Sequence, residues 1–318
     1  MKSRVYLKKI LGLIFLVAAF LIVASFVPNF LTISNLLNVV RQSSIIGICA
    51  VGMTLVIIIK GIDLSISGLL AFSPMVSGIL MLHGHNIFFS LAAGILVGLS
   101  MGFFNGLMVS TLSVPAFITT LVVGQVSEGL SLIMNGGRSI GGFPDSYVFL
   151  GNGTLFGIPI SDYLMLIFFL IGFIILKFTS LGNHILALGG NETVLRQEGI
   201  SVTKIQFFVY VFASFCTSVA GLLLSAQLDT VHPIQGEAYQ LDSIAACVIG
   251  GVDMAGGYGS VSMAMVGALI IGSLRNSLNL LGVHPFMQNI FVGIIIISIV
   301  FITGRIRQRN RKATRGVL

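Results

Sequence analysis

The 318-residue chain carries few charged side chains: Lys, Arg, Asp and Glu make up 8% of it, whereas hydrophobic residues make up 56%. A soluble domain usually carries about 25% charged residues, so this composition is too poor in charge to cover an ordinary water-facing surface. The mean hydropathy is +1.05. These values exclude a soluble enzyme, a disordered chain and a disulfide scaffold, and they predict an integral membrane protein.

The net charge of +7 and the pI of about 9.6 reflect where the basic residues lie. They gather beside apolar runs, chiefly at Lys2, Arg4, Lys8 and Lys9 near the start and over 305–315 near the end. Cytoplasmic loops of polytopic membrane proteins are enriched in Lys and Arg, so these clusters indicate orientation. Basic tails also attract anionic membrane lipid. No nucleic acid is expected as a partner.

Apolar runs predict an all-α, polytopic transmembrane helix bundle of about ten helices. A bilayer core of about 30 Å needs about 20 apolar residues per helix. The first run is longer than the apolar core of a cleaved signal, which is about 7–15 residues, so we expect it to remain as a helix. The expected spans are 10–27, 45–59, 66–82, 88–110, 116–134, 163–178, 205–226, 242–256, 260–281 and 287–304.

An even number of spans places both termini in the cytoplasm, and the basic residues agree with that layout. All but three of the 17 Lys and Arg residues then fall on the inner side, the exceptions being Arg41, Arg138 and Arg275. The chain is expected to form a single transmembrane domain over 1–318. Two segments lie outside the spans, an outer loop over 135–162 and an inner loop over 179–204.

Capping residues in the inner loop predict a short helix over 192–198. Asn191 is a good N-cap, Glu192 places an acid in the first turn, and Gly199 suits the C′ position. Such a helix is about 10 Å long and needs a partner surface to be stable. That surface is either the rest of this protein or a cytoplasmic partner.

Four blocks of sequence, taken in order, resemble the permeases of ribose-type ABC importers. The resemblance extends from about residue 35 to residue 304. It implies a multi-pass subunit of the bacterial cytoplasmic (inner) membrane that pairs with a second permease subunit, identical or different. The blocks are Gly61-Ile62-Asp63-Leu64-Ser65; Pro115-Ala116-Phe117-Ile118-Thr119-Thr120-Leu121; Leu188-Gly189-Gly190-Asn191-Glu192 with Gly199-Ile200; and Tyr239-Gln240-Leu241-Asp242-Ser243-Ile244-Ala245-Ala246-Cys247-Val248-Ile249-Gly250-Gly251, followed by Gly256-Gly257-Tyr258-Gly259.

The same resemblance implies the partners and the substrates. It implies an extracytoplasmic sugar-binding protein, cytoplasmic ATP-binding subunits, and a pentose, hexose or related polyol as cargo. The chain has no G-x-x-x-x-G-K-S/T phosphate loop, so ATP and Mg²⁺ are expected on the partner ATPase, with no cofactor in this chain. The resemblance assigns coupling to the ATPase to Gly189, Gly190, Asn191, Glu192, Thr193, Arg196, Gln197, Glu198 and Gly199.

Polar residues within the apolar runs are candidates for the substrate path. An Asp at mid-bilayer costs about 2.5–3.5 kcal/mol on insertion scales. Asp63 and Asp253 follow similar Gly-interrupted segments, and such breaks free backbone groups to line a cavity. Alternatively, each Asp caps a helix at its cytoplasmic end. A neutral sugar favours amides and hydroxyls, although each of these could instead bond a neighbouring helix. The candidates are Asp63, Ser65, Asn105, Thr119, Thr120, Gln125, Asn276 and Asn279.

Small residues have a structural explanation. Gly94, Gly98, Gly102 and Gly106 recur at four-residue spacing, which is typical of a helix-packing face. The isolated residues Cys49, Cys216 and Cys247 are expected to pack in the apolar interior.

Three positions depart from the family pattern, and the first two bear on the substrate. Lys60 stands where this family usually has Gly, Glu128-Gly129 where Arg-Gly is commoner, and Met263 where a small residue is usual. The first two change the charge near the path.

Other transport functions stay open. An ion-coupled secondary transporter would need no ATPase and would use Asp63 or Asp253 for proton coupling. An ABC permease for nucleosides or amino acids would share the architecture. An enzyme is not expected, and the chain contains no H-E-x-x-H zinc motif.

Overall fold

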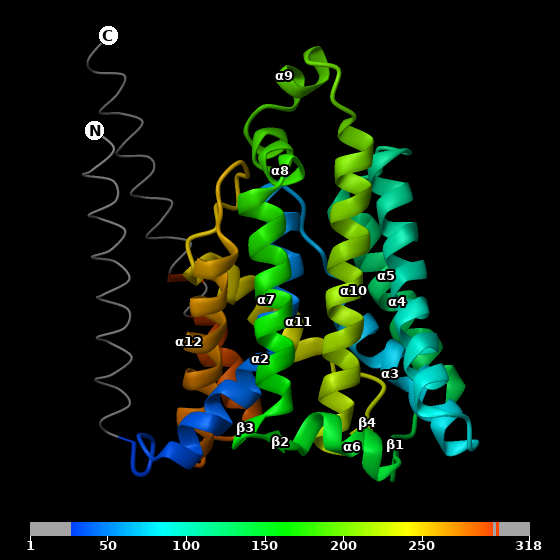
Figure 1. The fold of residues 1–318 in the computed structure, drawn as a ribbon, viewed down its shortest axis with the longest axis vertical. Helices are drawn as coiled ribbons and strands as arrows, with labels where there is room; N and C mark the ends of the chain where they lie inside the picture. The colour runs from blue at the N-terminus through cyan, green and yellow to red at the C-terminus, as the bar shows by residue number, and fades with distance from the viewer. Residues whose placement is uncertain (1–26, 295–296, 299–318) are drawn as a thin grey trace.

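The computed structural model describes residues 27–294 and 297–298, and helices dominate this part of the chain (Figure 1). Six of the described helices are long and apolar enough to cross a membrane, which confirms the polytopic helical class. The helices are α2 (Ile33–Ile58), α3 (Ile66–Leu82), α4 (Ile87–Ser110), α5 (Ala116–Met134), α6 (Asp145–Asn152), α7 (Ile160–Phe178), α8 (Ser180–Gly190), α9 (Glu192–Gln197), α10 (Val202–Leu228), α11 (Glu237–Ile249) and α12 (Val261–Leu280).

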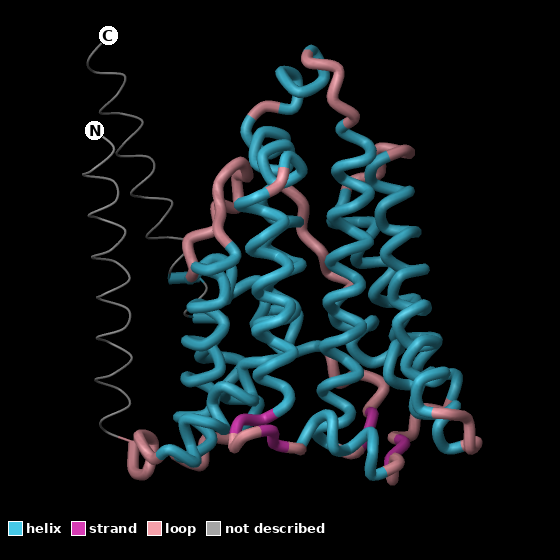
Figure 2. Tube along the Cα trace, in the orientation of Figure 1, coloured by secondary structure: helices cyan, strands magenta, loops and turns pink. Residues whose placement is uncertain are grey.

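The long helices run side by side, and the bundle has two different ends (Figures 1 and 2). One end, here called the α9 end, carries α8 and α9. The other, the strand end, carries α6 and four two-residue strands. There β1 (Ile140–Gly141) pairs antiparallel with β4 (Thr230–Val231), and β2 (Thr154–Leu155) pairs with β3 (Ile158–Pro159).

Helix α2 forms the centre of the bundle. In its most apolar stretch 89% of the residues are buried, and it contacts α7, α10, α11 and α12. Helices α4 and α7 are more apolar than α2 but only 22% and 28% buried over the same length. Because exposed apolar helix faces are stable in lipid but not in water, α4 and α7 are suited to the outside of a membrane bundle.

The glycines of α4 form its packing face, as the sequence predicts. All four are buried. A Cβ on Gly98 would overlap Ser218 Oγ, and one on Gly102 would lie 2.7 Å from Ser214 Cβ. The small residues therefore let α4 approach α10 closely.

Two expected spans begin or end elsewhere. Helix α2 starts at Ile33 rather than at 45, because the Thr32 side chain caps it and the buried Asn35 finds partners, although both residues lower the local hydropathy. Helix α11 covers Glu237–Ile249 rather than 242–256, because Gly251 adopts φ +77° and ends it. The span 10–27 and the ends of the chain lie outside the described residues, and 287–304 is described only in part. The count of about ten helices and the cytoplasmic termini thus stay predictions.

The inner loop contains one helix more than the sequence predicts. Helix α9, with Asn191 as its N-cap, matches the expected helix. Helix α8 precedes it and was not predicted, because Gly182, Gly189 and Gly190 weaken the local helical preference. Burial of Ile185 and Leu188 in the core stabilises α8 instead.

Candidate transport path and coupling segment

The chain leaves α2 through a tight helix-ending motif. Lys60 adopts φ +66°, its N–H donates to Ile57 O at 2.9 Å, and the N–H of Gly61 donates to Val56 O at 2.9 Å. These are the two hydrogen bonds of a Schellman motif, whose left-handed residue is usually Gly. The left-handed conformation required at this position explains why the family usually has Gly where this chain has Lys60. Beyond it the chain turns into the bundle as a non-helical segment (Figure 2).

This segment ends in a buried cluster of polar side chains. Asp63 Oδ1 accepts hydrogen bonds from the N–H and the hydroxyl of Ser65, at 2.9 and 2.5 Å. Asn105 Nδ2, from α4, donates to Ser65 Oγ at 3.0 Å. Thr120 Oγ1, from α5, accepts the N–H of Leu64 at 3.0 Å. Four of the eight expected path residues thus lie together around the start of α3, all of them 0% exposed.

The cluster also contains polar atoms that lack partners. Among the described residues, Asp63 Oδ2 and Asn105 Oδ1 of this cluster are buried without a hydrogen bond, and so is Thr119 Oγ1, one position before Thr120 on α5. Leaving a buried acceptor unpaired costs about 1–3 kcal/mol. The cluster can therefore accept hydrogen bonds from a hydroxyl-bearing molecule or from water.

A second helix begins beside α3 inside the bundle. Gln235 Nε2 donates to Leu70 O at 3.0 Å, and a Cβ on Gly236 would overlap Ser67 O. Because Gly236 is the N-cap of α11, the first turns of α3 and α11 lie against each other. In many transporters, helices interrupted in this way line the substrate site with their free N-terminal groups.

The remaining path candidates lie apart from this cluster. Gln125 is on an exposed face of α5. Asn276 accepts a hydrogen bond from Asn35 at 2.9 Å, and Asn279 accepts one from Gln288 at 2.7 Å. Both bonds join neighbouring segments, which is the structural alternative for such amides. The transport role of all eight residues stays a prediction.

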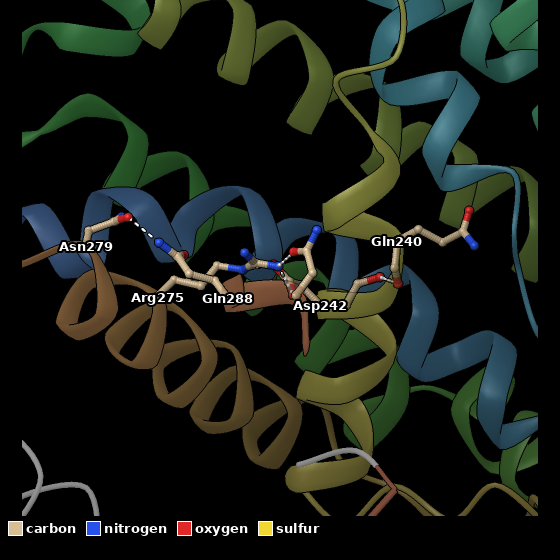
Figure 3. Close-up of polar contacts among 7 residues, drawn as sticks. Gln240, Asp242, Arg275, Asn279 and Gln288 are labelled. Carbon is tan, nitrogen blue, oxygen red and sulfur yellow. Dashed lines mark hydrogen bonds and ion pairs between the residues drawn. The ribbon is translucent and has the colours of Figure 1, made fainter. Parts of the chain in front are cut away.

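An ion pair that was not predicted from the sequence joins α11 to α12 (Figure 3). Arg275 lies beside Asp242, which is 1% exposed, and its guanidinium also donates to Asn289 Oδ1 at 3.2 Å. One acid and one base in consecutive apolar runs could have indicated the pair, since charges within a membrane usually find partners. The side chain of Gln240, two residues before Asp242 on α11, points away from the pair and adds an amide near the start of that helix.

Helix α9 projects from the bundle on the far side of α8. Asn191 Oδ1 accepts the N–H of Thr193 at 3.0 Å, and Gly199 adopts φ +76°, so both predicted caps are confirmed. Leu195 is buried, whereas Glu192 and Arg196 are exposed and form an ion pair at 2.7 Å. The helix thus fixes one face to its own protein and leaves a charged face free.

One pattern with a catalytic meaning occurs in a setting that does not support it. Gly98 to Gly102 matches G-x-S-x-G, yet Ser100 lies within α4 and donates to Val97 O at 2.6 Å. A hydrolase nucleophile needs a sharp strand-to-helix turn instead. The match reflects the glycine spacing of the packing face.

The helical fold, with the interrupted helices α3 and α11 inside the bundle, defines a membrane transport protein. The chain belongs to the family described as "Branched-chain amino acid transport system / permease component", which it matches over residues 35–300. No solved structure matches the chain.

Named relatives are transport components rather than enzymes. The chain is 39% identical over 302 residues to the ribose import permease protein RbsC of Escherichia coli, covering 94% of this chain and 93% of the relative. It is 38% identical over 294 residues to the protein of the same name in Haemophilus influenzae, covering 91% and 90%. It is 31% identical over 293 residues to the L-arabinose transport system permease protein AraH of Escherichia coli, covering 92% and 89%.

Proposed function

We propose that this chain is the membrane-spanning permease subunit of a sugar-importing ABC transporter, acting on a pentose, hexose or related polyol. The observation that carries the proposal is its similarity, over nine-tenths of its length, to permeases named for ribose and L-arabinose. The family description names branched-chain amino acids, so the class of cargo needs support from the chain itself.

The chemistry of the path favours a polyhydroxylated neutral cargo. The cluster of Asp63, Ser65, Asn105 and Thr120 offers hydroxyls, an amide and a carboxylate, with acceptor atoms free for a donor. An amino acid carries an ammonium group and a carboxylate, so its binding site would offer a charged partner of opposite sign to each. Asp242, another buried carboxylate, is already neutralised by Arg275.

The two ends of the bundle suit two different partners. At the α9 end lie Lys60, Lys177, Arg196 and Lys204, which supports a cytoplasmic location for that end. An ATP-binding subunit would meet the free face of α9 and the adjoining residues 189–199. A sugar-binding protein would dock at the strand end, and a second permease subunit would complete the path.

Transport then depends on two conformations with different contacts. ATP-driven closure of the ATPase pair would move α9 relative to the bundle. The interrupted helices α3 and α11 would shift between conformations open to either side. This chain forms no covalent bond with its cargo.

Proton coupling remains the second candidate, because Asp63 is a fully buried carboxyl group with one unpartnered oxygen atom. In that mechanism Asp63 would gain and lose a proton during each cycle, and no ATPase would be needed.

The cargo is tested by uptake into proteoliposomes that contain the chain, its ATPase and its binding protein. Radiolabelled ribose, arabinose, a hexose, a nucleoside and leucine would be compared at equal concentration, with ATP inside. Uptake of one of the sugars, and not of leucine or the nucleoside, is the expected result. Uptake of leucine alone would refute the proposal.

A further inference from the structure

Three segments far apart in the sequence meet through their backbones at the α9 end. The N–H of Gly257, in the loop between α11 and α12, donates to Ile58 O at the end of α2, at 2.8 Å. Gly189, near the end of α8, lies against both of these residues. We call Ile58, Gly189, Gly256 and Gly257 the glycine joint.

The joint has no room for a side chain on its glycines. A Cβ on Gly189 would overlap Ile58 O and Gly257 N, and would lie 2.9 Å from Gly257 Cα. A Cβ on Gly257 would lie 2.7 Å from Gly190 N and 2.8 Å from Gly190 Cα. Because the obstructing atoms are backbone atoms, no rotation of a side chain can relieve these contacts.

The neighbouring glycine shows that this crowding is specific. Gly190 is exposed, and a Cβ built on it would meet nothing within 4 Å. Two adjacent residues of α8 therefore differ in whether an added side chain would meet α2 and the 250–259 loop.

Each segment of the joint leads to a different part of the bundle. Gly189 stands two residues before Asn191, the N-cap of α9. Ile58 precedes the segment that descends to Asp63 and the start of α3. The loop that holds Gly257 is closed by bonds from Asp253 N to Tyr258 O and from Gly256 N to Asp253 O, at 2.9 and 2.8 Å, and it joins α11 to α12.

We propose that the glycine joint transmits the displacement of α9 to both interrupted helices, α3 and α11. Backbone-to-backbone contact suits this role, because close-packed atoms transmit a displacement, whereas flexible side chains absorb it. The inference rests on the proposed function, since it takes the push on α9 from an ATPase. It assigns a positioning role to Gly189 and Gly257, which do not touch the cargo.

The test compares Gly189→Ala in the complete transporter with the control Gly129→Ala on α5, where an added Cβ would meet nothing within 4 Å. Coupling between sites typically changes a response 5–150-fold, so uptake by Gly189→Ala should fall about tenfold or more. Its ATPase rate should lose the response to loaded binding protein, while the ATPase subunit still co-purifies in full amount. Gly129→Ala should transport like the wild type.

A second pair of variants covers the case in which Gly189→Ala does not fold. A Cβ on Gly259 would lie 2.8 Å from Ile58 Cγ1 and 2.9 Å from Ile58 Cδ1, which are side-chain atoms. Gly259→Ala should therefore reduce uptake moderately, and adding Ile58→Ala should restore part of it.

Three outcomes would overturn the inference. They are normal uptake by Gly189→Ala, an equal loss in Gly129→Ala, and loss of ATPase binding, which would make the joint a docking element. A wild-type transporter that needs no ATPase would refute the proposed function itself, before any variant is compared.

Discussion

Arg275 donates two hydrogen bonds to Asp242: its Nε lies 2.5 Å from Asp242 Oδ2, and one terminal nitrogen lies 2.8 Å from Oδ1. Asp242 is 1% exposed and Arg275 18%, so the pair is almost completely removed from solvent. Such two-pronged geometry fixes the two helices in one register. The pair therefore holds α11, which is only 13 residues long, against α12.

Removing one partner of this ion pair should destabilise the protein. Asp242→Ala leaves a guanidinium without its counter-charge inside the bundle, and such losses cost about 3–5 kcal/mol. The double variant Asp242→Leu with Arg275→Met should recover much of this, because apolar residues of similar volume often replace buried pairs without loss. Denaturant unfolding in detergent measures both. A single variant as stable as the wild type would contradict the interpretation.

Lys60→Gly should stabilise the protein. Lys60 adopts φ +66°, and the left-handed conformation costs an ordinary L-residue about 1–2 kcal/mol. Glycine adopts it without that cost, although the unfolded chain gains freedom, so we expect a net gain of about 1 kcal/mol or less. Lys60→Ala keeps the Cβ and is the control that should show no gain. Thermal unfolding of the three proteins tests this, and a stability order that places Ala above Gly would refute it.

Changes to the ion pair on α9 should affect coupling rather than stability. Glu192 and Arg196 are 46% and 61% exposed, and an exposed pair four residues apart contributes about 0.3–0.5 kcal/mol. Glu192→Ala and Arg196→Ala should therefore insert and melt like the wild type but lose uptake and ATPase stimulation. Exchanging the two residues keeps an ion pair and alters only the order of the two charges on the face offered to a partner. The exchange should therefore also impair uptake. Normal uptake by these variants would count against the coupling role.

Asp63→Asn separates the two candidate functions. Asn retains an Oδ1 acceptor for the N–H and hydroxyl of Ser65, so the turn before α3 should persist. Asn has no carboxyl proton to exchange. In an ATP-driven importer the variant should keep measurable uptake that an uncoupler does not change. Complete loss of uptake, together with uncoupler sensitivity of the wild type, would favour proton coupling.

Features set by local sequence were predictable. The glycine spacing of α4 and the caps of α9 depend on residues within a few positions of one another, and both are confirmed. The similar sequences around Asp63 and Asp253 also form similar local hydrogen bonds. Each Oδ1 accepts the N–H two residues further on, from Ser65 and from Ala255, at 2.9 Å.

Features set by distant contacts were not predictable from one sequence. Asp63 is buried deep in the bundle, whereas Asp253 is half-buried in a loop at the α9 end, although their local sequences are alike. The meeting of Gly189 with Ile58 joins residues 131 positions apart, and no periodicity indicates it. Helix α8 owes its stability to burial against the core, so its weak helical preference concealed it.

The most direct test of the account is uptake of sugar by purified protein in vesicles with and without the ATPase subunit. We expect uptake only when the ATPase, internal ATP and the loaded binding protein are all present, and no response to an uncoupler. Uptake at an undiminished rate in vesicles that lack the ATPase would contradict the claim that a separate subunit drives this chain through α9.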